Sequence, residues 1–203
     1  TARGGKGCVV ALLFPVAGAC TSRTKHKASR EMRSEELHFG TPAIVGTLLL
    51  PANASRPPVS VLLSGSGPND VDETLGPNKP FLDLATGLAK DGIATFRFAK
   101  RTQQLPATLN LTTYTATAEY VPDALAAVHL LAHRNDVDPG RIIVLGHSLG
   151  GTFAPKVAVQ EPKIVGVIVM AAAVESFGQL LARQITYVAS LPGAVGDAAR
   201  QQI

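Results

Sequence analysis

The sequence predicts an α/β fold built on a mostly parallel sheet with helices on both faces. From residue 59 to residue 173, short apolar runs of strand type alternate with stretches of helical spacing, and strands connected in this way pair in parallel. Glycine-rich turns follow two of these strands, at residues 64–70 and 146–151. The 203 residues, of which 46% are hydrophobic and 17% charged, suffice for one such domain with a substantial core.

The first predicted elements of the domain are the strands of an antiparallel hairpin. Residues 36–39 and 44–50 have strand character and are joined across Gly40-Thr41-Pro42. Residues 59–63 form the next strand, which runs into the glycine-rich segment 64–70. Because so much glycine does not favour a helix, we expect a functional loop there.

Helices and a further strand follow this loop. The spacing of apolar residues predicts a helix over residues 81–90, which Asp91-Gly92 ends, and then a strand over residues 93–98. After a threonine-rich loop, an amphipathic helix is predicted over residues 118–131, with Pro122 near its first turn.

The last elements repeat the alternation. A turn at residues 137–140 precedes a β-branched strand over residues 141–145, and a helix is expected over residues 152–160. A strand follows at residues 164–170. From Glu175 onward, apolar residues recur at helical spacing until a Leu-Pro-Gly break.

The segment Gly146-His147-Ser148-Leu149-Gly150-Gly151 joins a predicted strand to a predicted helix, and this context indicates a nucleophile elbow. Gly146 and Gly150 lack the Cβ atoms that would collide with the neighbouring strand and helix. Ser148 is therefore the candidate nucleophile. The alternative is a structural Gly-Ser turn.

The glycine-rich loop and the elbow together resemble the α/β-hydrolase superfamily. Leu63 to Asp70, Asp72-Glu73-Thr74 and Gly76 to Phe81 look like an exported bacterial branch of esterases and serine-aminopeptidase-like hydrolases. Asp91-Gly92-Ile93 and Lys100-Arg101-Thr102 occur in the family's order, and the resemblance spans about residues 36 to 190.

The resemblance implies an oxyanion hole made of two backbone N–H groups. By position in the family, the loop donor is Ser66, and the second donor is Leu149, at the start of the helix after the nucleophile. Two residues depart from the family's pattern. Ala99 stands where relatives carry an aspartate, and Leu149 replaces a commonly acidic residue, which makes the floor of the site more apolar and favours acyl chains over amines.

The sequence lacks a histidine after Ser148, although the triad order in this fold is Ser, Asp or Glu, and then His. The histidines before it are His26, His38, His129, His133 and His147. We expect His147 to project away from Ser148 and to pack. His129 and His133 are four residues apart on one helix, but no third metal ligand is near them, so we expect a solvated face and no metal.

The acids after Ser148 are Glu161, Glu175 and Asp197. We expect the first two to be surface charges and Asp197 not to be the triad acid. We therefore expect a fragment that lacks the C-terminal part of the fold, in which residue 175 begins a cap or the next crossover. Such a fragment would retain at most weak residual catalysis.

Residues 1–19 are predicted to be a signal peptide, residues 20–35 a basic linker, and residues 36–203 the hydrolase domain. Arg3 and Lys6 precede a short apolar run with small residues at its end. The protein is thus expected to be exported. Cys20 resembles the lipid-modified cysteine of bacterial lipoproteins, which would anchor the protein to a membrane. The alternative is that the apolar run forms a strand or helix of the domain.

The leading functional hypothesis is a serine hydrolase that cleaves carboxylic esters through an acyl-enzyme on Ser148. A peptidase or amidase of the same fold and a non-catalytic binding protein are the alternatives, and the substrate is a small-molecule ester or a short peptide. No cofactor is expected, because the loop at 64–70 lacks both the dinucleotide spacing and the P-loop lysine. The net charge of +4 comes largely from the predicted linker, so no nucleic-acid partner is expected.

Overall fold

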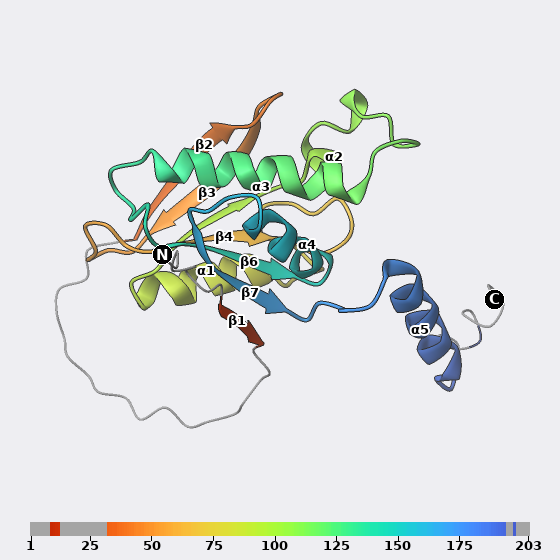
Figure 1. Cartoon of the computed structure of the whole chain (residues 1–203). Coiled ribbons are helices and arrows are strands. Elements are labelled where there is room, and N and C mark those ends of the chain that lie inside the picture. The colour runs from red at the N-terminus through yellow and green to blue at the C-terminus, as the bar shows by residue number, and fades with distance from the viewer. Residues whose placement is uncertain (1–8, 13–31, 194–196, 198–203) are drawn as a thin grey trace, which may run out of the picture. The chain divides into compact units, whose positions relative to one another are not determined.

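A seven-stranded sheet forms the centre of the unit Thr1–Ala172, and residues Ala173–Ile203 form a second unit (Figure 1). The computed structural model describes residues 9–12, 32–193 and 197. In order across the sheet, the strands are β1 (Val9–Leu12), β7 (Ile164–Met170), β6 (Ile142–His147), β4 (Val59–Leu63), β5 (Ala94–Phe98), β3 (Ile44–Leu50) and β2 (Arg33–Phe39).

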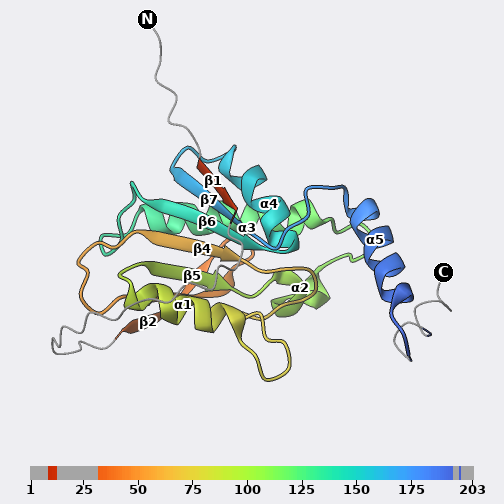
Figure 2. The ribbon, with the colours of Figure 1, turned by 90° about the horizontal axis from the view of Figure 1, so that it is seen from below.

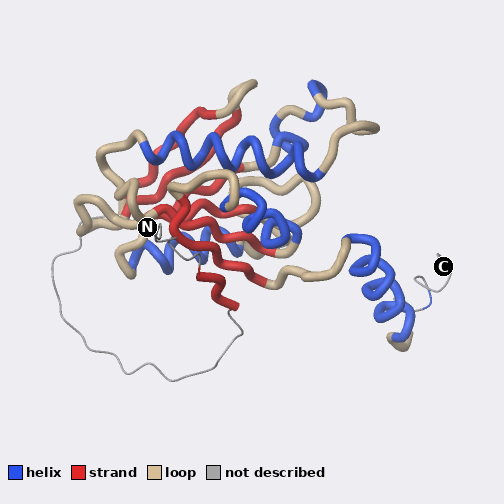
Figure 3. The backbone as a smooth tube through the Cα atoms, viewed as in Figure 1, coloured by secondary structure: helices blue, strands red, loops and turns tan. Residues whose placement is uncertain are grey.

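The five strands from β1 to β5 in this order are parallel, and β3 and β2 continue the sheet as an antiparallel hairpin. Figure 3 shows the strands in red and the helices around them in blue. Every residue of β4 and β5 is buried, as expected for strands covered on both faces. β3 alternates buried and half-buried residues, which is the pattern of a strand with one face in the core. The predicted mostly parallel α/β fold is confirmed.

Helices cover both faces of the sheet (Figure 2). Leu62 packs with Phe81 of α1 (Pro80–Lys90) on one face. Val61 packs on the other face, in the core that contains the buried side chains of α3 (Ala116–Ala132) and α4 (Leu149–Ala158). This division follows from β4, because successive side chains of a strand point to opposite faces.

Strand β4 marks the point where the direction of chain winding reverses. Its neighbours are β5 on one side and β6 on the other. Ligand sites in such sheets form beyond the carboxyl ends of the strands at this reversal. The glycine-rich loop after β4 and the turn after β6 both lie there, as the sequence predicts.

Some boundaries differ from the sequence-based expectations. Helix α4 begins at Leu149 rather than at residue 152, because the two glycines in its first turn weaken the helical signal. Pro122 lies inside α3 rather than near its first turn, since the helix begins earlier than predicted. The threonine-rich loop contains a short helix, α2 (Arg101–Gln104), and a 3₁₀ turn, η1 (Pro106–Thr108), both too short to give a periodic pattern.

Strand β1 lies within the stretch in which the signal peptide is predicted. It pairs in parallel with β7, which agrees with the alternative that the apolar run contributes a strand. The predicted cleavage site, Cys20 and most of the basic linker lie outside the described residues. Among the helices that are described, none is long and apolar enough to cross a membrane.

The second unit consists mainly of α5 (Phe177–Ser190). Ser176 and Gln179 form a capping box at its start, in which each side chain bonds the other residue's backbone N–H. The helix ends before Leu191, whose backbone is extended because Pro192 follows it.

Candidate active site

Ser148 lies at a sharp bend between β6 and α4, in a backbone conformation that is rare for a side-chain-bearing residue. Its φ is 51° and its ψ is −120°. Such conformations cost about 1–3 kcal/mol and persist where the surroundings enforce them. Here the Ser148 N–H donates to the Met170 carbonyl at 2.8 Å, and the Ser148 carbonyl accepts the Gly151 N–H at 3.0 Å. The neighbouring strand and the first helical turn thus hold the bend.

The glycines on either side of Ser148 are required by close backbone packing. A methyl group on Gly146 would lie 2.3 Å from the Gly150 carbonyl oxygen. A methyl group on Gly150 would lie 2.2 Å from the Leu63 carbonyl oxygen, at the end of the adjacent strand β4. These contacts are far shorter than van der Waals distances, so the elbow and the β4 loop can approach each other only because both positions are glycine.

The backbone N–H groups of Ser66 and Leu149 have no hydrogen-bond acceptor among the described residues. The loop of Ser66 reaches the elbow, since a methyl group on Gly65 would lie 3.2 Å from Ser148 Cβ. Leu149 begins α4, and its N–H belongs to the positive end of the helix dipole. The loop that carries Ser66 and the start of α4 therefore meet at Ser148.

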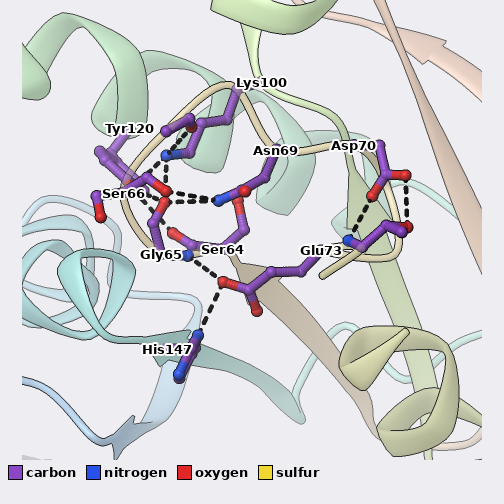
Figure 4. A network of polar contacts seen from close by, with 11 residues as sticks. Ser64, Gly65, Ser66, Asn69, Asp70, Glu73, Lys100, Tyr120 and His147 are labelled. Atoms are coloured by element: carbon purple, nitrogen blue, oxygen red, sulfur yellow. Dashed lines mark hydrogen bonds and ion pairs between the residues drawn. The ribbon is translucent and has the colours of Figure 1, made fainter. Parts of the chain in front are cut away.

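The side chain of Glu73 connects the β4 loop to the elbow (Figure 4). Glu73 Oε1 accepts the Gly65 N–H at 2.5 Å and lies 2.8 Å from Nδ1 of His147. Glu73 has a φ of 54° and is 2% exposed. An ion pair between Asp72 and the buried Arg97, 3.2 Å apart, fixes the loop next to it.

Lys100 and Tyr120 hold the same loop from the other side (Figure 4). The Lys100 ammonium contacts the Gly65 carbonyl oxygen and lies 2.9 Å from the Gly67 carbonyl oxygen and 2.6 Å from the Tyr120 hydroxyl. The Tyr120 ring stacks on Phe153 of α4, with 4.9 Å between the ring centroids. This stacking directs the hydroxyl at the loop.

Burial and neighbouring charges shift the pKa values of these groups. Burial lowers the pKa of Lys100 to about 8, although the carboxylates of Glu119 and Glu73 act against the shift. The hydrogen bond that His147 donates to Glu73 raises the pKa of His147 above its usual value. Burial, together with the charges of Glu119 and Glu73, raises the pKa of Tyr120.

A pocket of about 390 Å³ opens beside the elbow. Its lining is mainly apolar and includes Leu149, Leu111, Tyr114 and Pro68. Lys100 and Glu119 contribute charged groups to its wall, of which Glu119 is bound by the Thr102 hydroxyl at 2.8 Å. The pocket can accept a small apolar group next to Leu149, the residue after Ser148.

Three of the described histidines, His129, His133 and His147, are engaged with groups other than Ser148. His147 binds Glu73, so its predicted packing role is corrected to a polar one. His129 lies 2.5 Å from Glu161, and His133 bonds the His129 carbonyl. Within the described ranges, no group of three or more histidine, cysteine or acidic side chains could hold a metal ion.

The acids that follow Ser148 are also engaged elsewhere. Glu161 is buried and binds His129 and the Lys163 N–H, so the expectation of a surface charge is wrong for this residue. Glu175 pairs with the exposed Arg183, in agreement with a surface role.

Sequence reasoning missed the roles of Glu73, Lys100 and Tyr120 in holding the loop. Glu73 and Lys100 belong to the stretches that carry the family resemblance, which was the available signal. Tyr120 lies inside a helix whose pattern indicated only an amphipathic face, and its contact with residue 65 spans 55 positions.

The chain is similar to known hydrolases. The family model for serine aminopeptidases of group S33 matches residues 79–195, more than half of the chain. Esterase EstD of Thermotoga maritima is 40% identical over 157 residues, which cover 77% of this chain and 37% of EstD. The chain thus spans little more than a third of this relative's length.

Solved structures show the same fold at low sequence identity. A 2,6-dihydroxy-pseudo-oxynicotine hydrolase superposes with a TM-score of 0.57 at 20% identity, over 85% of this chain and 46% of that chain. The hyperthermophilic esterase from the archaeon Pyrobaculum calidifontis gives 0.52 at 22% identity, over 70% and 44%. With the family match over residues 79–195 and the elbow on a mostly parallel sheet, the chain belongs to the serine aminopeptidase S33 family of α/β-hydrolases.

Proposed function

We propose that Ser148 is the nucleophile of a hydrolase that cleaves carboxylic esters, with the N–H groups of Ser66 and Leu149 as its oxyanion hole. The observation that carries the proposal is the position of Ser148, at a strained bend where the loop of Ser66 meets the start of α4; the Ser66 and Leu149 N–H groups lack acceptors among the described residues. Preorganised donors of this kind stabilise the charge that develops on an attacked carbonyl oxygen.

The reaction proceeds in two steps. Ser148 Oγ attacks the ester carbonyl carbon, its proton passes to a base, and the alcohol leaves as the acyl-enzyme forms. Water then attacks the acyl-enzyme, so that the acid is released and Ser148 regains its proton. Each step passes through a tetrahedral oxyanion, which the Ser66 and Leu149 N–H groups bind.

The base is not among the described histidines, because those next to the site are bound to other groups. His147 is the nearest in sequence, and its Nδ1 faces Glu73. We propose that the triad acid and histidine come from residues outside this chain, which matches 37% of the length of EstD. Without them, the chain would retain only the weak catalysis that binding and an oxyanion hole supply.

The apolar pocket supports an ester with a small acyl or alkyl group. Leu149 contributes both a wall of the pocket and an oxyanion donor, so a group bound there lies next to the reacting carbonyl. A peptidase or amidase is the second candidate, favoured by the description of the matching family as serine aminopeptidases. Comparing kcat/KM on p-nitrophenyl acetate and on aminoacyl p-nitroanilides separates the two activities.

The test of the proposal is Ser148→Ala in the protein expressed from its complete gene. With p-nitrophenyl acetate, we expect kcat to fall by a factor on the order of 10⁶, as in other serine hydrolases that lose the nucleophile. Ser55→Ala, in the exposed loop before the start of β4 and thus at the opposite end of that strand from the Ser66 loop, is the control and should leave kcat unchanged. Activity that survives Ser148→Ala would refute the assignment, and a wild-type protein inactive on esters and anilides would favour a binding function.

A further inference from the structure

The carbonyl oxygen of Gly65 collects more hydrogen-bond donors than a loop carbonyl requires (Figure 4). The Lys100 ammonium contacts it, and Asn69 Nδ2 lies 2.9 Å away. The Tyr120 hydroxyl lies 2.7 Å away and shares its one hydrogen between this oxygen and the Ser64 carbonyl oxygen at 2.9 Å. A carbonyl oxygen has two lone pairs, and one or two donors satisfy it. The peptide that joins Gly65 to Ser66 is therefore held unusually firmly.

Fixing this oxygen fixes the direction of the Ser66 N–H. The peptide between Gly65 and Ser66 is trans, so its C=O and N–H point in opposite directions. The oxygen faces Lys100 and Tyr120, and the Ser66 N–H is left without an acceptor among the described residues.

The preceding peptide is fixed as well. Glu73 Oε1 accepts the Gly65 N–H at 2.5 Å, and the same oxygen binds His147, the residue before the nucleophile. Gly65 is thus held through its N–H and through its carbonyl oxygen. Its Cα lies against the elbow, because an added methyl group would be 3.2 Å from Ser148 Cβ.

The three acceptors around Lys100 match the three N–H bonds of an ammonium group. They are the carbonyl oxygens of Gly65 and Gly67 and the Tyr120 hydroxyl, and the residue is 5% exposed. A positive charge at the carbonyl end of a peptide draws electrons toward the oxygen. The N–H at the other end becomes a stronger donor, as in other polarised hydrogen-bond chains.

We propose that Lys100, with Tyr120, is a positioning residue of the oxyanion hole, which directs and polarises the Ser66 N–H through the Gly65 carbonyl. The inference rests on the proposed function of Ser148. In this role Lys100 acts on the oxyanion through the peptide that joins Gly65 to Ser66 rather than by contact with the reacting atoms, although Lys100 also lines the pocket.

The test compares kinetic constants of Lys100→Met, which keeps the length of the side chain and removes its charge. With p-nitrophenyl acetate, we expect kcat to fall by roughly 10²-fold, the loss typical of one oxyanion donor, while KM stays within about threefold. Tyr120→Phe should lower kcat less, by about tenfold, because Lys100 and Asn69 still hold the oxygen. Lys156→Met is the matched control, since Lys156 is exposed and its ammonium lies over the Phe153 ring.

A transition-state mimic gives a second readout. Phenylboronic acid forms a tetrahedral anion with an active serine, so its affinity should fall in Lys100→Met in parallel with kcat.

The pH profile of kcat gives a third readout. The charged groups facing Lys100 are Glu119 from α3 and Glu73 from the loop, and wild-type kcat should fall as the pH rises through the Lys100 pKa of about 8. Lys100→Met should lack this alkaline limb.

The inference is overturned if Lys100→Met keeps kcat within threefold of wild type or retains the alkaline limb. Should Lys100→Met fail to fold, Tyr120→Phe decides, because it removes a single hydroxyl group. An unchanged kcat in a folded Tyr120→Phe overturns the inference, and a selective loss of kcat supports it. Ser148→Ala, measured alongside, separates the two proposals: activity that survives it overturns the nucleophile itself.

Discussion

At the residue scale, the site depends on a few positions where the surrounding atoms allow only one residue type or one backbone conformation. Gly150 is the tightest of them. It lies where α4 crosses the end of β4, and the adjacent carbonyl oxygens leave no room for a side chain. The close approach of the loop of Ser66 to the elbow follows from this contact.

Gly150→Ala should therefore destabilise the fold. The added methyl group would lie 2.2 Å from the Leu63 carbonyl oxygen and 2.6 Å from that of Ser64, and overpacking of this kind costs about 1–3 kcal/mol or more. We expect urea denaturation to show a free energy of unfolding lower by at least about 2 kcal/mol. Gly87→Ala, in α1 with no atom within 4 Å of the new methyl group, should instead stabilise by about 0.5–1 kcal/mol. Equal effects of the two changes would contradict the packing account.

The pair of Glu73 and His147 should be visible in the titration of the imidazole. Glu73 raises the pKa of His147, whereas burial alone lowers it. We expect NMR titration to place the His147 pKa above 6.5 in the wild type and below it in Glu73→Gln. Because the folded pKa is raised, the pair stabilises the fold below about pH 6.5, and this contribution is lost as the pH rises through the folded pKa. An unchanged His147 pKa in Glu73→Gln would refute the pairing.

At the element scale, a buried ion pair ties the segment after β5 to α3 and to the hairpin of β2 and β3. Arg101 of α2 binds Asp123 of α3 at 2.6 Å and donates to the Pro42 carbonyl at 2.8 Å. Asp123 is 1% exposed. The arrangement holds α3 and therefore Tyr120 at a fixed distance from the loop.

Arg101→Met should lower the free energy of unfolding by about 3–5 kcal/mol, because it leaves the Asp123 carboxylate buried without a partner. Arg33→Met is the matched control. Arg33 pairs with Asp136 at 2.5 Å, but its side chain is 62% exposed, so the loss should be at most about 1 kcal/mol. Thermal and urea denaturation measure the stability of both variants. Similar losses of unfolding free energy in the two would contradict the claim that burial makes the pair of Arg101 and Asp123 the more important one.

The sequence predicted the regular elements well, because their signals are local. The apolar runs of β4 and β7 are bounded by turn residues, and their observed limits match the predicted ones. The start of α4 was missed because Gly150 and Gly151 are poor helix formers. The contact of Glu73 with His147 joins residues 74 positions apart, and no periodic pattern carries information about such a pair.

At the scale of the whole molecule, export is a proposal that rests on the sequence before residue 20. Cleavage after Ala19 would leave Cys20 as the new N-terminus and would remove β1, which pairs with β7. We expect the intact mass of the protein produced in a bacterial host from its complete gene to show this cleavage. A mature protein that keeps residues 9–12 would instead support β1 as part of the domain.

The identity of the nucleophile is the claim on which the functional account depends, and covalent labelling tests it most directly. A fluorophosphonate probe phosphonylates a serine only where the hydroxyl is activated and an oxyanion hole is present. In the protein from the complete gene, we predict that peptide mapping by mass spectrometry places the label on Ser148 and that Ser148→Ala abolishes labelling. A label on any other residue, or labelling that persists in a folded Ser148→Ala variant, would contradict the account.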